Sequence, residues 1–479
     1  MTEAGPVLAR IAERAMVEAG FVAHPPPRAE AEAAAVRAAP DAAGARDLRA
    51  LPWTSIDNVE SRDLDQIEAV ENVAGGMKLY VGVADVEHAA VYGGAVDQYA
   101  GGNTTSVYTG ARTFPMLPES LSFDRTSLLA QAERLAVVVE TVIAPDGRMS
   151  SGAVYAARVI NQAKLDYPSV SAWLDGRAAA PAGLAGRPEL LEQLRRQDAL
   201  AASLAAARRR LGALDLDTHE VDVVVDARGA VTELTPHSQD RAGAIIEELM
   251  IASNTALALE LDRRGLPSIR RVVKEPERWE KIAAYAAGFS VKLPAAPSAP
   301  ALSQFADQMR REQAARFGEI SVALVKLIGR GEYEAHRPGQ DETGHFGLAA
   351  QAYAHGTAPN RRYVDLVAQR IVKASRAYSF DELAAVAARC TEREIAAKKV
   401  ERRVRKSAGA LLLQGSVGRT FDAVVTGAGP KGTYARLFDP HVEGKVVRGE
   451  KGLKVGDRAR VALVEADVER GYIDFAVTS

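Results

Sequence analysis

The pattern of hydrophobic and polar positions changes twice along the chain. Over residues 6–20 apolar side chains recur at helical spacing as far as Gly20, and an alanine-rich stretch over residues 29–49 predicts one or two further helices. From about Leu51 β-branched runs alternate with turn signals, and the tail over residues 415–479 consists of short strand-like segments separated by glycines. The pattern predicts an N-terminal helical module over 1–49, an α+β domain over 50–414 and a β-rich domain over 415–479.

The α+β domain is predicted to begin with a mixed sheet and to end in helices. Residues 78–86 and 134–144 are β-branched runs that predict strands, and residues 220–234 predict a hairpin turning at 227–229. Apolar residues at helical spacing then predict four helices, over 242–264, 305–327, 361–377 and 380–413.

The two end modules raise separate questions. The N-terminal helices fit either a helix-turn-helix or an alanine-rich pair that packs on the main domain. The tail fits a five-stranded barrel of the OB type. Its ten basic and nine acidic residues nearly balance, so an RNA contact there would depend partly on the aromatic residues Phe421, Tyr434 and Phe438.

Composition excludes several classes of protein. The 479 residues include 60 Lys and Arg against 62 Asp and Glu, a net charge of -2, which excludes a polycation but leaves a local basic face open. A lone Cys390 excludes an intrachain disulfide and zinc sites built from several cysteines. The first residues lack a basic n-region and no stretch approaches 18 apolar residues, so we expect no signal peptide, no membrane partner and a cytoplasmic location.

Carboxylates are crowded in one segment, SIDNVESRDLDQIEA at residues 55–69. Asp63 and Asp65 are two positions apart and share a side in an extended chain, and Asp57 can reach them if the intervening residues loop back. Converging carboxylates offer the hard oxygen ligands that Mg²⁺ or Mn²⁺ prefer. A solvated acidic loop is the alternative interpretation.

A pair of cations stands where a loop meets a predicted helix. Arg361 and Arg362 precede an apolar periodic stretch, and the helix dipole disfavours positive charge at that end. Two guanidinium groups there indicate a bound anion such as phosphate, which arginine clamps in a bidentate manner. Ordinary surface charge at a helix start is the alternative.

Taken together, these segments resemble the RNase II (RNB) family of exoribonucleases. The segment at 55–69 resembles the family's metal-binding signature. Later blocks resemble family motifs in the right order over roughly residues 50–410, and the tail resembles the S1-type OB barrel that usually ends such chains. The blocks are LYVGVADVEHA, FPMLPESLS, KLDYPSV, IIEELMIASN and HFGLAAQAYAHGTAPNRRYVDL.

The resemblance implies roles for the acidic segment. Asp57, Asp63 and Asp65 match three of the four motif aspartates that hold the metal, and the residue matching Asp65 is the most critical for catalysis in the family. The fourth position is Gln66, which has an amide oxygen but no negative charge. We therefore expect weaker binding of one metal ion.

The resemblance also implies an RNA-binding set. Arg361 matches the arginine that braces the scissile phosphate, followed by Arg362, although the motif reads APNRRY, with Ala358 and Asn360 departing from the family's Ser-Pro-Ile-Arg. Tyr108 matches an aromatic that stacks on the terminal base, with a core strand position as its alternative. Tyr167 matches a tyrosine near the 3′-end nucleotides, with core packing as its alternative, and Glu401 matches a glutamate near the terminal ribose.

The implied activity is Mg²⁺-dependent, or Mn²⁺-dependent, 3′-to-5′ hydrolysis of single-stranded RNA, processively, to nucleoside 5′-monophosphates. Many family members carry two cold-shock barrels that we do not recognise here, which predicts tolerance of structured RNA. We expect no obligate protein partner, and we expect the protein to be a monomer. The alternatives are an RNA-binding relative weakened by Gln66 and a phosphodiesterase acting on DNA or a small nucleotide.

Overall fold

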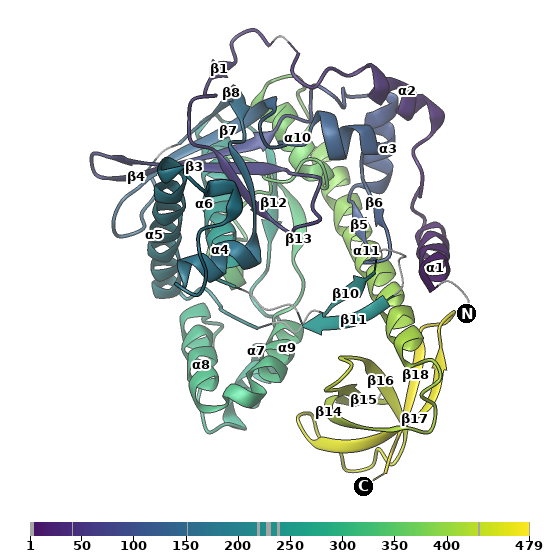
Figure 1. Cartoon of the computed structure of the whole chain (residues 1–479). Helices are drawn as coiled ribbons and strands as arrows, with labels where there is room; N and C mark the ends of the chain where they lie inside the picture. Colours follow the sequence, from purple (N-terminus) through teal and green to yellow (C-terminus); the bar gives the residue numbers. More distant parts are fainter. Residues whose placement is uncertain are drawn as a thin grey trace.

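A mixed seven-stranded sheet forms the centre of the large domain (Figure 1). The structure, a computed structural model, describes residues 4–40, 42–150, 152–217, 221–226, 231–236, 240–429 and 432–478. The edge strands β1 and β9 run parallel to their neighbours, and the other pairs are antiparallel. In spatial order the strands are β1 (Arg46–Asp47), β8 (Ala153–Ile160), β7 (Glu133–Ile143), β4 (Gly76–Ala84), β3 (Gln66–Val73), β2 (Thr54–Asp57) and β9 (Ala163–Asp166).

The register of this sheet brings the predicted acidic residues to one end of it. Thr54 of β2 pairs with Glu68 of β3 in an antiparallel ladder. Asp57 is the last residue of β2 and Asp65 immediately precedes β3. Because consecutive antiparallel strands start and finish at the same edge, the loop between them lies at that edge together with both aspartates.

Helices cover both faces of the sheet. Val70, Leu79 and Val81 point toward α5 (Pro188–Leu211) and α6 (Arg241–Arg263), where Leu204 and Leu249 join the same buried cluster. Residues of the opposite parity, such as Ile67 and Tyr80, belong to the cluster that includes α10 (Tyr363–Val372) and α11 (Phe380–Leu413). The period-two alternation of side chains along a strand separates the two clusters.

Helix α6 is long and apolar enough to cross a membrane, but 67% of its apolar window is buried inside the fold. It packs against β4 and β7, as a core helix does. The length and apolar composition of α6 are therefore only weak evidence for a membrane-spanning helix.

Three of the four predicted helices are confirmed as α6, α10 and α11, and the fourth is wrong as a single helix. Residues 305–327 are divided between α8 (Ala299–Glu312), a 3-10 turn and α9 (Phe317–Ile328), with Gln313 outside helical geometry. The chain turns because Phe305 and Met309 of α8 and Ile320 and Leu324 of α9 fill one shared core. A continuous helix could not bring both sets of side chains to the same place.

The smaller elements complete the large domain. The predicted hairpin is confirmed as an antiparallel β10–β11 pair, and its turn at 227–229 lies outside the described residues. At the N-terminus, α1 packs on α11 and α2 on α3. The remaining bounds are α1 Ala4–Glu18, α2 Pro27–Ala35, α3 Ala95–Asn103, β5 Val107–Tyr108, β6 Thr113–Phe114, α4 Tyr167–Leu174, β10 Val221–Val225, β11 Val231–Pro236, β12 Ser268–Val272, α7 Trp279–Ala287 and β13 Glu332–His336.

The tail is a closed five-stranded barrel, as its pattern predicted. Its core includes Leu437, Val461 and Phe475, and the last turn of α11 joins the same cluster through Leu413. Phe438 is exposed, whereas Phe421 packs partly against the barrel core. The strands are β14 (Thr420–Gly429), β15 (Gly432–Leu437), β16 (Glu443–Arg448), β17 (Arg458–Asp467) and β18 (Tyr472–Val477).

Candidate active site

Asp65 is a buried carboxylate held against the loop that precedes α10. Its side chain is 2% exposed, and its Oδ1 accepts a hydrogen bond from the backbone N–H of Asn360 at 2.8 Å. Its Oδ2 lies 3.2 Å from Nε of Arg361. Burial raises the pKa of Asp65 to about 7, against the opposing effect of Arg361 and with a further increase from Asp63. The sheet edge and this loop, 295 residues apart in sequence, therefore meet at Asp65.

Asp63 and Tyr108 form a second contact at the same place. The Tyr108 hydroxyl donates to Oδ2 of Asp63 at 2.5 Å, and the Tyr108 backbone N–H donates to Oε1 of Glu401 at 3.1 Å. Enclosure of the hydroxyl among protein atoms, together with the charge of Asp63, raises the pKa of Tyr108. The residue as a whole is still 41% exposed, so its ring is not a core side chain of β5.

Asp57 has hydrogen-bond partners of its own, within the loop that follows β2. Its Oδ1 accepts hydrogen bonds from the backbone N–H of Asn58 and from Oγ of Ser61, both at 2.7 Å. Its charge raises the pKa of Glu68 and of Tyr167, after the larger effect of burial in each case. Asp63 thus contacts Tyr108 and Asp65 contacts Arg361, whereas the hydrogen bonds of Asp57 are to its own loop.

The three aspartates do not form a closed cage without a metal. Within the described ranges, the trio of metal-ligating side chains whose atoms lie within 4.8 Å of one another is Asp262, His336 and Glu342. Arg270 already donates to Asp262 at 2.5 Å and to Glu342 at 3.2 Å, so a guanidinium supplies the positive charge in that trio.

The acidic segment nevertheless fits a hard divalent cation. Among the described residues, Oδ2 of Asp65 and both carboxylate oxygens of Glu68 are buried without a hydrogen-bond partner, although Oδ2 of Asp65 forms the ion pair with Arg361. Uncompensated buried carboxylate oxygens are costly, and a cation ligated by oxygen offsets that cost. Asp57, Asp63 and Asp65 would be its ligands, with the amide oxygen of Gln66 nearby.

The neighbouring arginines play different structural parts. Arg362 is the residue before α10 and donates to Oδ1 of the fully buried Asp365 at 2.7 Å. Arg361 is 44% exposed in its side chain, and its carbonyl accepts from the backbone N–H of Ser106 at 3.1 Å. The predicted loop-to-helix junction is confirmed. The exposed side chain of Arg361 can bind an anion, whereas the side chain of Arg362 forms an ion pair with the buried Asp365.

The two departures from the family motif are accommodated by the backbone. The N–H of Ala358 donates to Asp365 at 2.7 Å, and that of Asn360 donates to Asp65. The Asn360 side chain accepts from Oγ1 of Thr126 at 2.6 Å. The contacts that shape the loop therefore do not require the family's serine and isoleucine side chains.

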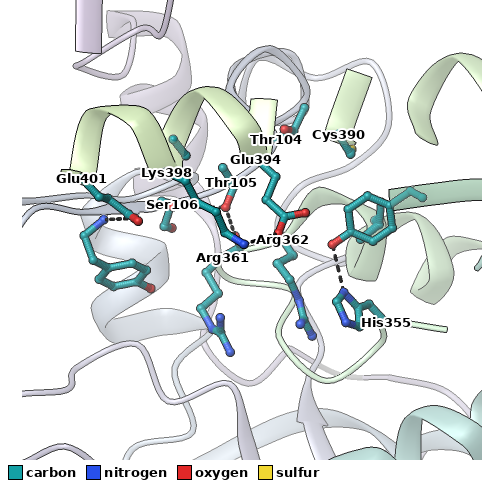
Figure 2. Close-up of a pocket in the computed structure, with 14 residues that line it drawn as sticks. Thr104, Thr105, Ser106, His355, Arg361, Arg362, Cys390, Glu394, Lys398 and Glu401 are labelled. Atoms are coloured by element: carbon teal, nitrogen blue, oxygen red, sulfur yellow. Dashed lines mark hydrogen bonds and ion pairs between the residues drawn. The ribbon is translucent and has the colours of Figure 1, made fainter. Parts of the chain in front are cut away.

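A cavity of about 230 Å³ lies between this loop and α11. Figure 2 shows Arg361 and Arg362 extending side by side from the loop, with Glu394, Lys398 and Glu401 on the facing helix. Tyr108 lines the same cavity. Burial would raise the pKa of Glu394, but Arg271, at 2.6 Å, holds it below its usual range, so Glu394 stays charged. The cavity thus offers an aromatic face and cationic groups together.

Tyr167 lies within reach of the charges of both Asp57 and Arg361, which act on its pKa in opposite directions after the larger effect of burial. It begins α4 and packs partly against the cluster that contains Ile56 and Leu165. It is not among the described residues that line the cavity. Its position beside Asp57 is compatible with both interpretations of this residue, RNA contact and core packing.

The sequence did not predict three residues that lie at or near the candidate site. Asn360 acts through its backbone, which no side-chain pattern reveals. His355, which contacts the Tyr333 hydroxyl at 2.9 Å in the cavity wall, is separated from it by 22 residues. Glu68 is an acidic residue between Ile67 and Ala69 in a strand, and its position among apolar neighbours is a signal that could have been used.

Comparison with known proteins agrees with the geometry. The model of the RNB domain matches residues 45–377. The chain therefore belongs to the RNB family, as its motifs predicted. The model of the RNase II-type exonuclease C-terminal S1 domain matches residues 419–478, the closed barrel.

Curated relatives carry the name Ribonuclease R. That of Thermotoga maritima is 30% identical over 91% of this chain and 65% of its own length, and that of Escherichia coli is 27% identical over 91% and 58%. The chain thus spans about three fifths of the length of these relatives.

Solved structures share the fold. Mycoplasma genitalium RNase R in complex with ribose methylated single-stranded RNA has a TM-score of 0.88 at 23% identity, covering 98% of this chain and 78% of that one. The structure of yeast Ssd1, described as a pseudonuclease, has a TM-score of 0.67 at 18% identity over 89% of this chain and 53% of that one.

Proposed function

We propose that this chain is a metal-dependent exoribonuclease that removes nucleotides from the 3′ end of single-stranded RNA as 5′-monophosphates. The observation that carries the proposal is the buried Asp65 carboxylate beside the exposed Arg361 guanidinium, at the edge of a cavity that Tyr108 also lines. Membership of the RNB family and the names of the relatives support it.

Asp57, Asp63 and Asp65 would hold Mg²⁺ or Mn²⁺ at the end of the sheet. A bound divalent cation supplies activation of the attacking water and stabilisation of the leaving oxygen in phosphodiester hydrolysis. The backbone N–H of Asn360 fixes the Asp65 carboxylate by a 2.8 Å hydrogen bond, so this ligand is oriented before substrate arrives.

Arg361 would meet the scissile phosphate. Asp65 contacts its Nε, which leaves the terminal nitrogens of the guanidinium to face an anion. Negative charge that develops on the phosphate in the transition state is stabilised most by a donor already held in place. The hydrogen bond from Ser106 to the Arg361 carbonyl holds the backbone of this residue.

Tyr108 and the facing helix would bind the RNA itself. An exposed aromatic ring stacks on a base without reading its identity, which suits degradation of any sequence. Lys398 adds a positive group to the cavity wall, and Glu401 accepts the Tyr108 N–H, which orients the aromatic residue. The barrel at the end of α11 would extend the path of the single strand.

A second candidate is an RNA-binding protein without turnover. Gln66 favours it, because this position carries no charge where the family has an aspartate. A fold of this kind also occurs in yeast Ssd1, a protein that is described as a pseudonuclease.

The test uses 5′-labelled single-stranded RNA with Mg²⁺, in wild type, Asp65→Asn and Asp146→Asn. Asp146 lies in an exposed turn after β7, at the opposite end of the sheet from Asp65, and serves as the matched control. The proposal expects a ladder that shortens from the 3′ end in wild type and in Asp146→Asn, and none in Asp65→Asn. RNA binding with no shortening in wild type would establish the second candidate instead.

A further inference from the structure

The carboxylate of Asp63 is oriented by one side chain, that of Tyr108. The Tyr108 hydroxyl donates to Oδ2 of Asp63 at 2.5 Å. Within the described residues, Oδ1 of Asp63 accepts no hydrogen bond, and no Lys or Arg lies within ion-pair distance of this carboxylate. An ionised aspartate has acceptors alone, so the proton in the contact belongs to the hydroxyl. One oxygen of Asp63 is therefore held, and the other is left for a further ligand.

The main chain around Asp63 is fixed by a buried serine. Ser127, which is fully buried, donates from its Oγ to the Arg62 carbonyl at 2.6 Å and accepts the Leu64 N–H at 3.0 Å. One hydroxyl thus holds the backbone on either side of Asp63. The carboxylate could still turn about its own side-chain torsions, and a hydrogen bond at one of its oxygens removes that freedom.

Tyr108 is fixed at the opposite end of the contact. It pairs with Thr113 in the β5–β6 hairpin, next to the fully buried Val107. Its backbone N–H donates to Oε1 of Glu401 on α11 at 3.1 Å. Because the hairpin and the helix both hold this main chain, the Tyr108 hydroxyl has a defined place relative to the Asp63 carboxylate.

The same division of oxygens recurs in the other two predicted ligands. Asp65 accepts the Asn360 N–H at Oδ1, and its Oδ2 has the ion pair with Arg361 but no hydrogen bond. Asp57 accepts both of its hydrogen bonds at Oδ1, from the loop that follows β2. Among the described residues, each carboxylate of the trio thus keeps one oxygen without a hydrogen bond. Asp63 differs in that its donor is a side chain that also lines the cavity.

We propose that Tyr108 is a positioning residue for the divalent cation, whose hydroxyl orients Asp63 so that Oδ1 of that carboxylate faces the ion. Hydrogen bonds of this kind fix metal-ligating carboxylates, and loss of one weakens metal affinity by about 10- to 100-fold. Since the ring of Tyr108 is the proposed stacking surface for RNA, one side chain connects the cation with the base. This inference rests on the proposed function, because it concerns the cation of the same site.

The first experiment measures Mn²⁺ binding by isothermal titration calorimetry, without RNA, in the full chain. The variants are Tyr108→Phe and Tyr155→Phe. Tyr155 is the matched control because its hydroxyl donates to a carboxylate oxygen of Glu140, also at 2.5 Å, and neither of these two residues lines the cavity. The expected result is about tenfold weaker Mn²⁺ binding in Tyr108→Phe and no change in Tyr155→Phe. Unchanged affinity in Tyr108→Phe would overturn the inference.

A second measurement separates positioning from a general structural role. In the Asp65→Asn background, Tyr108→Phe should bind labelled RNA nearly as tightly as its parent, because the ring is kept. Loss of RNA affinity in parallel with Mn²⁺ affinity would show that the whole residue had moved, and the inference would fail. Thermal unfolding followed by circular dichroism compares Tyr108→Phe with Tyr155→Phe. Each variant loses one such hydrogen bond, so a loss of Mn²⁺ affinity confined to Tyr108→Phe is not a loss of fold.

Failure of this inference is distinguishable from failure of the proposed function. Release of monophosphates by wild type, together with unchanged Mn²⁺ affinity in Tyr108→Phe, would leave the function standing and remove Tyr108 from the cation site. Absence of both Mn²⁺ binding and monophosphate release in wild type would remove both.

Discussion

Nε of Arg361 lies 3.2 Å from Oδ2 of Asp65, so the exposed cation of the loop and the buried carboxylate of the sheet edge are in direct contact. The hydrogen bond from Asn360 to Asp65 joins the same two segments, across 295 residues of sequence. A substrate phosphate and a metal would approach this contact from the cavity. Arg361 and Asp65 therefore hold each other in place before the reaction begins.

The exposed arginine should act mainly on the chemical step. We expect Arg361→Met to lower kcat for RNA hydrolysis by on the order of 100-fold, because a donor placed at developing charge is worth that much. Arg361→Lys should recover part of the loss. Single-turnover rates on 5′-labelled RNA measure the effect, and an unchanged rate in Arg361→Met would exclude a role at the phosphate.

The second arginine should act on stability instead. Arg362→Met leaves Asp365, which is fully buried, without its cationic partner, and only the Ala358 N–H still donates to it. We expect the free energy of unfolding to fall by about 3 kcal/mol, the cost of an uncompensated buried charge. Adding Asp365→Asn should restore part of the stability, because the amide oxygen still accepts the Ala358 N–H. Denaturant titration followed by circular dichroism compares the three proteins, and equal midpoints in all of them would contradict the prediction.

Tyr108 should contribute to RNA affinity through its ring. In an Asp65→Asn background, where the RNA stays intact, Tyr108→Ala should weaken binding by about 5- to 150-fold, which corresponds to the roughly 1–3 kcal/mol of one base stack. Tyr108→Phe should bind nearly as well, since it loses only the hydrogen bond to Asp63. Tyr92→Ala, another exposed tyrosine that does not line the cavity, is the control. Fluorescence anisotropy with labelled RNA measures the dissociation constants, and equal losses in the alanine and phenylalanine variants would argue against stacking.

A histidine near the cavity should make stability depend on pH. Burial, followed by the charge of Arg271, lowers the pKa of His345 to about 4 from the ordinary 6.5. The unfolded chain therefore takes up the proton first, so stability is complete above pH 6.5 and is lost as the pH falls from 6.5 toward 4. His345→Asn should flatten the fall in the free energy of unfolding over that window by up to about 1.4 kcal/mol per pH unit, and should change the free energy of unfolding less at pH 8. His355, whose pKa is also lowered, leaves a residual slope. Parallel profiles for wild type and variant would show that His345 does not contribute.

Local patterns were enough to predict much of the fold. The β-branched runs at 78–86 and 134–144 became β4 and β7, and the helix predicted over 380–413 became α11, with a Ser379–Glu382 capping box at its start. These elements could be predicted because their signals lie within a few turns of chain. The helix predicted over 305–327 was wrong because a shared core, not local spacing, decides where that segment turns.

The sequence by itself determined which residue types could serve a metal and a phosphate: three aspartates at close spacing, and two arginines before a helix. Only the tertiary structure decided how they are divided. It paired Asp65 with Arg361 and Arg362 with Asp365, and it left Asp57 hydrogen-bonded within its own loop. Contacts between segments hundreds of residues apart depend on sheet register and on packing against helices, which adjacent residues do not encode.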